Sequence, residues 1–198
     1  MKKIISAILI IVAVFSLAAC KEETFKDGEV TFHADEMSIT LPANFQEVEI
    51  KEENQSSEYK EFRFNSGYHK IKIKVFKYEK DKLKEEANMS IGDFFNTKFE
   101  EFQNDGAYHD LKKLTDPNNL PYFQYYEFEN AMFRQTSYGS YYNSVFESDN
   151  AFWHIKIQDQ KNDFVNGEFD KNKSDFFQWM QTVTFTDKKH QQFQISKE

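Results

Sequence analysis

The chain has 198 residues and a formal charge of −8 at pH 7, with 25 basic and 33 acidic side chains. Its length suits one domain with a sizeable core, and its 22 phenylalanines against 6 glycines and 3 prolines are the opposite of a disordered composition. An acidic domain is also a poor candidate for binding nucleic acid, which requires a basic patch, or for adhering electrostatically to anionic lipid.

The first 19 residues predict a secretory signal peptide. Lys2 and Lys3 form a positive start, residues 4–17 are almost entirely apolar, and small residues precede Cys20. This combination is typical of secretory signals. The apolar run is also shorter than the roughly 20 residues that a membrane-spanning helix needs.

The segment Leu17-Ala18-Ala19-Cys20 resembles a bacterial lipobox. The resemblance implies that the Cys20 thiol takes a diacylglycerol and that a lipoprotein signal peptidase cuts before it. An ordinary signal followed by a chance cysteine is the alternative. Cys20 is the only cysteine, so an intrachain disulfide is excluded. We therefore expect a lipid-anchored protein on the extracytoplasmic face of the cell membrane, held by more than one acyl chain.

Four segments follow from this reading. They are a lipoprotein signal peptide over residues 1–19, a lipidated tether over 20–28, a single globular domain over 29–187 and a C-terminal tail over 188–198. Cleavage removes two lysines and leaves 179 residues with a charge of −10. Because a chain reaches at most about 3.5 Å per residue, the short tether keeps the domain close to the membrane.

The first half of the domain predicts short strands over residues 30–32, 38–41 and 59–64 and a longer one over 68–78. In the longer strand, isoleucine and valine alternate with Lys70, Lys72 and Lys74, which is the period of a strand. The lysines read either as an anion-binding stripe or as the solvated face of an edge strand, where lysine discourages aggregation. We favour the edge strand.

Two helices are expected. The first begins at Ser90, which with Asp93 three residues later makes a variant of the capping box, and it carries one stripe of apolar residues. The second spans about 171–181, with Asp170 as its cap, and a closing strand follows over 182–186.

Between the helices we expect a short strand over 111–114 and a four-stranded antiparallel meander over 122–158. Two-residue turns are predicted at Gly139-Ser140 and Asp149-Asn150. One face of this meander should hold Phe128, Phe133, Phe146, Trp153, Ile155 and Ile157, and the other Phe123, Tyr125, Arg134, Tyr138, Tyr141, Val145, Phe152 and His154. The second of these faces is mixed rather than polar, so another element should cover part of it.

A candidate binding surface lies near the predicted Gly139-Ser140 turn. Tyr138, Tyr141 and Tyr142 crowd this position, and tyrosine is enriched where proteins meet partners. The alternative is that these rings pack beneath the helix that covers the second sheet face.

Residues 37–45 (MSITLPANF) and 176–185 (FFQWMQTVTF) resemble the corresponding ends of the PsbP-like group, which includes bacterial lipoproteins of the DcrB type. The resemblance implies an α+β fold, an α/β/α sandwich around a central antiparallel sheet. Phe45 stands where the group has tryptophan. The group shares a fold rather than a chemistry, so no functional residue carries over.

No catalytic constellation is evident. The five histidines show no close pairing, so we expect neither a metal site nor a cofactor. The expected function is a non-enzymatic binding or accessory module that holds an envelope protein, peptide or polymer near the membrane. The alternatives are an immunity-type lipoprotein that neutralises a secreted toxin and, less favoured, an envelope hydrolase using a carboxylate pair.

Overall fold

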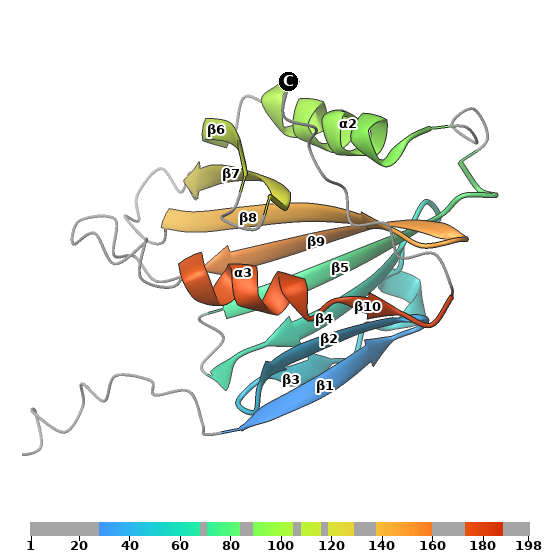
Figure 1. Ribbon diagram of the computed structural model, residues 1–198, viewed down its shortest axis with the longest axis vertical. Helices are drawn as coiled ribbons and strands as arrows, with labels where there is room; N and C mark the ends of the chain where they lie inside the picture. Colours follow the sequence, from blue (N-terminus) through green and yellow to red (C-terminus); the bar gives the residue numbers. More distant parts are fainter. Residues whose placement is uncertain are drawn as a thin grey trace, which may run out of the picture.

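A computed structural model describes residues 28–67, 71–83, 89–104, 108–115, 119–128, 138–159 and 173–187. The signal peptide, Cys20, the tether up to residue 27 and the tail from residue 188 lie outside the described residues, so their predicted roles stay predictions. Within these ranges the chain is α+β, with two antiparallel sheets and two α-helices (Figure 1).

The larger sheet has seven strands in the order β3-β4-β5-β9-β8-β7-β6. A smaller sheet has the order β1-β2-β10 and joins the two ends of the domain, because Thr184 of β10 pairs with Ser38 of β2. The larger sheet comprises β3 (Gln46–Val48), β4 (Lys60–Asn65), β5 (Ile71–Glu79), β6 (Tyr108–Thr115), β7 (Pro121–Phe128), β8 (Tyr138–Glu147) and β9 (Ala151–Asp159). The smaller comprises β1 (Glu29–Ala34), β2 (Met37–Pro42) and β10 (Thr184–Phe185), and the helices are α2 (Ile91–Asn104), α3 (Lys173–Gln181) and the 3-10 turn η1 (Glu52–Asn54).

One face of the larger sheet packs against the smaller sheet and α3. Trp153 is fully buried there, and its indole Nε1 donates to Ser148 Oγ at 3.1 Å. The prediction that Trp153 shares a face with Phe146, Ile155 and Ile157 is confirmed, since all four lie in one cluster. The same cluster takes in Met37, Ile39 and Leu41 of β2 and Phe176, Trp179 and Met180 of α3.

The other face packs beneath α2, which lies over β8 and β6 (Figure 1). The predicted capping box is confirmed: Asp93 N donates to Ser90 Oγ and Ser90 N donates to Asp93 Oδ2, both at 3.2 Å. The expectation that another element covers this face is also confirmed. The buried residues here include Phe94 and Phe95 of α2 and Phe123, Tyr141, Val145 and Phe152 of the sheet.

Three expectations need correction. Gly139 and Ser140 form no turn, because both lie inside β8, where Gly139 pairs with Glu127 and Ser140 with Tyr126. Within the described residues the meander therefore has three strands, β7, β8 and β9, and the Asp149-Asn150 turn between the last two is confirmed by the pairing of Phe146 with Trp153. The lysine-bearing strand β5 is not an edge strand, since it lies between β4 and β9.

Candidate functional site: a cleft at one end of the larger sheet

An open cleft of about 380 Å³ lies where β4 begins and β5 ends. Its volume falls in the range of small-molecule sites, roughly 300–1,000 Å³. The segment between β3 and β4, which contains η1, forms one wall, and lysines of the two strands form another. The lining residues are Ile50, Glu52, Gln55, Ser56, Ser57, Glu58, Tyr59, Lys60, Lys77, Glu79 and Lys82.

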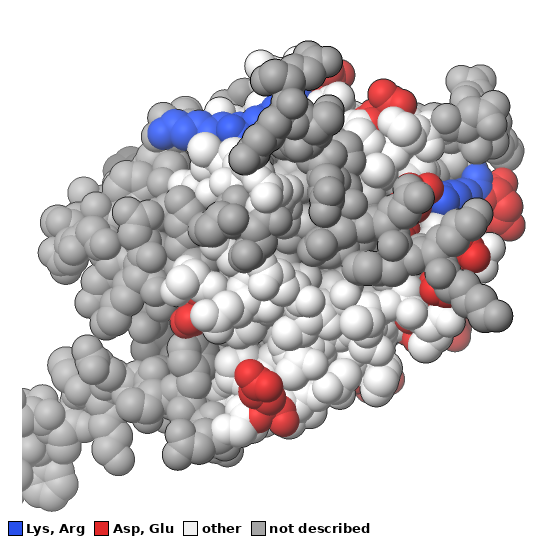
Figure 2. All heavy atoms as spheres, viewed as in Figure 1, with Lys and Arg blue, Asp and Glu red and all other residues white. Residues whose placement is uncertain are grey.

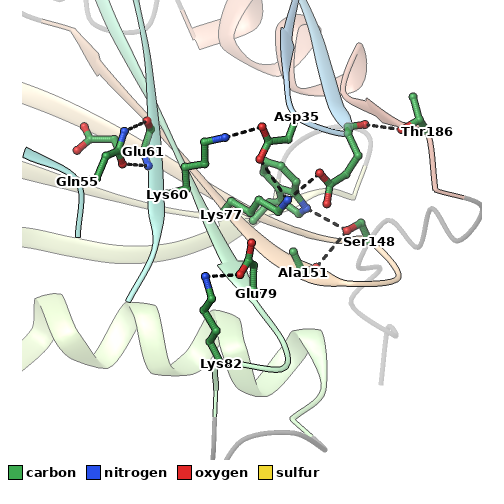
Figure 3. Close-up of polar contacts among 12 residues, drawn as sticks. Asp35, Gln55, Lys60, Glu61, Lys77, Glu79, Lys82, Ser148, Ala151 and Thr186 are labelled. Atoms are coloured by element: carbon green, nitrogen blue, oxygen red, sulfur yellow. Dashed lines mark hydrogen bonds and ion pairs between the residues drawn. The ribbon is translucent and has the colours of Figure 1, made fainter. Parts of the chain in front are cut away.

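The wall formed by residues 50–59 is fastened to β4 by a side-chain amide. Gln55 Nε2 donates to the Glu61 carbonyl oxygen at 3.1 Å, and the Glu61 N–H donates back to Gln55 Oε1 at 2.8 Å (Figure 3). The Gln55 amide thus supplies the hydrogen-bond donor and acceptor that the backbone of a neighbouring strand would supply. Glu58 N also donates to Ser56 Oγ at 3.1 Å, a local turn of the kind that serine supports. The wall is therefore held in place without belonging to the sheet.

Lys77 ties the cleft to the β1–β2 turn. Its ammonium donates to Glu36 Oε2 at 2.8 Å and Asp35 Oδ2 at 3.2 Å, and Lys60 donates to Asp35 Oδ1 at 2.6 Å (Figure 3). Lys77 Nζ also lies 5.5 Å from the ring centroid of Trp153, within the range of a cation–π contact. Asp35 adopts a left-handed conformation with φ of 52°, which aspartate tolerates better than most residues. The turn thus brings two carboxylates against two lysines.

Two opposing effects, ion pairing and burial, determine the pKa values in this cluster. Burial alone would lower the pKa of Lys77, but its hydrogen bonds to Glu36 and Asp35 outweigh that effect and raise it. For Asp35, burial acts to raise the pKa, and the hydrogen bonds from Lys60 and Lys77 bring it below its usual value. Both residues therefore stay charged at neutral pH, and Lys77 is a fixed cation rather than a proton donor.

The rest of the cleft carries charges of both signs beside an aromatic ring. Lys82 pairs with Glu79 at 2.5 Å, and Glu52 and Glu58 lie on the opposite wall. The Tyr59 ring packs edge-on against Phe76, with centroids 5.1 Å apart. A surface of this kind suits a ligand with both positive and negative groups.

A serine and a histidine do meet elsewhere, on the smaller sheet. His33 Nδ1 lies 2.9 Å from Ser38 Oγ, the spacing of a nucleophile and its base. His33 is exposed and Ser38 is half-buried, and neither lines the cleft. In the described residues no three histidine, cysteine, aspartate or glutamate side chains are placed to hold a metal ion.

The tyrosines proposed from sequence do not form an exposed tip. Tyr141 is 5% exposed, on the α2 face, and Tyr142 is 4% exposed, on the Trp153 face. The alternative of packed rings describes these two residues, whereas the side chain of Tyr138 lies outside the described residues, as does the lipidation candidate Cys20. Sequence reasoning missed the cleft, although the polar run Glu52–Glu58 between two strands was a visible signal of a surface segment.

Comparisons with known proteins assign no family. No family model matches the chain, and no curated protein matches it. One similar solved structure is a crystal structure from Bacteroides thetaiotaomicron, with 12% identity, a TM-score of 0.40, and alignment over 77% of this chain and 46% of that one. The chain thus spans less than half the length of that protein. No described helix is long and apolar enough to cross a membrane.

Proposed function

We propose that this chain is an extracytoplasmic lipoprotein, anchored through Cys20, that acts as a non-enzymatic binding module at the cell envelope. The motif Leu17-Ala18-Ala19-Cys20 supports the anchor. The layers formed by α2, the larger sheet, and α3 with the smaller sheet support the α/β/α sandwich of the PsbP-like group as its fold. The chemistry of the cleft supports binding rather than catalysis.

The single observation that carries the proposal is the position of the cleft relative to the tether. The tether enters β1 beside β2, where the Ala43 N–H donates to the Gly28 carbonyl oxygen at 3.1 Å. The opposite end of β1 leads into the turn whose Asp35 and Glu36 contact the cleft lysines. A strand of six residues is about 20 Å long. The cleft therefore lies at the end of β1 opposite to the one that the tether joins, which supports a ligand site held away from the lipid.

The ligand that fits this cleft best is a segment of peptide or protein carrying charges of both signs. Lys82, Glu58 and Glu52 offer partners for either charge, and Tyr59 offers an apolar ring with a hydroxyl. Tyrosine gives a large contact area with little side-chain entropy to lose. A ligand held here would stand clear of the membrane that anchors the domain.

The test uses the lipidated chain in cells, with a photoreactive residue at Ser57 in the cleft. Illumination should give a discrete adduct that protease treatment of the attached partner removes. The matched control places the same residue at Glu47, an exposed position on β3 that does not line the cleft. Equal adducts from both positions, or none from Ser57, would refute binding in the cleft.

A further inference from the structure

A row of three cations crosses the larger sheet. Arg63 of β4 pairs directly with Lys74 of β5, and Lys74 pairs directly with Lys156 of β9. Directly paired residues project from the same face, and neighbouring strands lie about 4.8 Å apart. The three side chains therefore start from a straight line about 10 Å long, perpendicular to the strands.

The row lies on the α2 side of the sheet but extends beyond the helix. Lys156 is two residues from His154, which belongs to this face. The helix reaches β5 at Tyr78, four residues beyond Lys74, where the rings of Tyr78 and Phe94 lie 5.2 Å apart. Arg63 and Lys74 keep 38% and 34% of their side-chain surface exposed. The opposite side of the molecule differs: Figure 2 shows scattered charges there, most of them acidic.

One carboxylate stands within the row, since Glu61 pairs with Arg63 and lies 3.9 Å from Lys74 Nζ. Like charges placed directly opposite each other destabilise a sheet. The composition does not force this pairing, because the chain has eight more acidic than basic side chains. Protection of an exposed edge does not explain it either, because β4, β5 and β9 all have neighbours on both sides. At physiological ionic strength charges more than about 8 Å away are screened, so distant acidic side chains act only weakly on the row.

The cations are held in place by other side chains. Glu61 accepts from Arg63 Nε at 2.6 Å and from Arg63 Nη2 at 3.1 Å, and it lies 3.9 Å from Lys74 Nζ. Lys156 Nζ lies 4.4 Å from the ring centroid of Tyr141 and 5.4 Å from that of Phe102. Groups fixed in this way lose less entropy when a ligand binds.

We propose that Arg63, Lys74 and Lys156 bind a linear polyanion that carries phosphate groups. A linear ligand fits because the cations stand in a line rather than converging on one point. Phosphate fits because a guanidinium matches its oxygens and an ammonium binds it as a point charge. This surface is distinct from the cleft, so its failure would leave the proposed binding of peptide untouched.

The test measures binding of short-chain inorganic polyphosphate by titration calorimetry, with the lipidated chain in phosphatidylcholine vesicles. The double variant Lys74→Gln/Lys156→Gln should bind at least tenfold more weakly. The change removes repulsion within the row together with the Lys74–Glu61 ion pair and the ring contacts of Lys156, so the melting temperature is measured alongside to show that the double variant is folded. If the double variant does not fold, Lys74→Gln alone should still weaken binding at least threefold.

The matched control is Lys51→Gln/Lys112→Gln, which removes the same charge from two exposed positions away from the row and should bind like wild type. An equal loss in this control would mean attraction to net charge, and would overturn the proposal. So would equal binding of orthophosphate at the same total phosphate, or equal binding of poly-glutamate. Tighter association with phosphatidylglycerol vesicles than with polyphosphate would assign the row to a lipid surface instead.

Discussion

His154 lies on β9 beneath α2 and is 3% exposed. Its Nε2–H donates to Asn143 Oδ1 at 2.8 Å, and Asn143 Nδ2 donates in turn to the Phe123 carbonyl oxygen at 3.4 Å, which fixes the orientation of the amide. Burial first, and then the charges of Lys98 and Lys156, hold the pKa of His154 well below its ordinary value of 6.5. The ring is therefore neutral in the folded protein at any mildly acidic pH.

This burial predicts a loss of stability on mild acidification. Below pH 6.5 the unfolded chain binds a proton at His154 that the folded chain does not, so the free energy of unfolding falls as pH falls. The loss should appear between pH 7.5 and 5.5, the range that brackets the ordinary pKa of an unfolded histidine. Urea unfolding at the two pH values measures it. The variant His154→Gln keeps a donor for Asn143 and should lack this contribution; an unchanged pH dependence in that variant would show that other groups cause it.

Single residues could be predicted from sequence where the period of a strand decides their position. The burial of Trp153 beside Phe146 follows from alternation along β9 and the short turn before it. The pairing of Lys77 with Asp35 and Glu36 could not be predicted, because it joins residues about 40 positions apart across two sheets. The period of the strand does separate Lys74 from Lys77, because their odd spacing puts them on opposite faces of β5, but what each one contacts depends on other strands.

At the scale of elements, the sequence correctly predicted features that depend on residues close together in the chain. Pairing between strands overrode weaker local signals. The start of α2 depends on two residues three positions apart, and the sequence located it correctly. Gly139-Ser140 is a plausible turn in isolation. In the fold, Ser140 pairs with Tyr126 on one side and Asp159 on the other, and these bonds continue β8 through the pair. The position of β5 inside the sheet depends on strand order, which no local pattern encodes.

The capping box of α2 should contribute measurably to stability. Replacing Ser90 with alanine removes the acceptor for the Asp93 N–H, and losing an N-cap costs about 1 kcal/mol. Urea unfolding should therefore show a lower midpoint with an unchanged slope. Ser90→Thr keeps the hydroxyl and should lose little. A loss of the same size in both variants would point to disturbed packing rather than to the cap.

At the scale of the whole molecule, the α+β class and the succession of strands and helices could be predicted from the sequence, but the closure of the domain could not. The smaller sheet is completed by β10 from the far end of the chain, where Thr186 N donates to the Glu36 carbonyl oxygen at 2.9 Å. That contact places the end of β10 beside the turn that also contacts the cleft lysines. The cleft thus depends on three segments that are distant in sequence.

The most direct test of an anchored domain with its cleft turned away from the lipid is energy transfer to the membrane surface. Cys20 is the only cysteine and its sulfur carries the proposed lipid, so a new cysteine can be labelled uniquely. A donor at Glu29→Cys marks the tether end of β1, and a donor at Ser57→Cys marks the cleft. The chain is placed in vesicles whose headgroups carry an acceptor, and Cys20→Ser, which should not reach the membrane fraction, serves as the control. We predict clearly higher transfer from position 29 than from position 57. Equal transfer, higher transfer from position 57, or membrane association that survives Cys20→Ser would contradict the account.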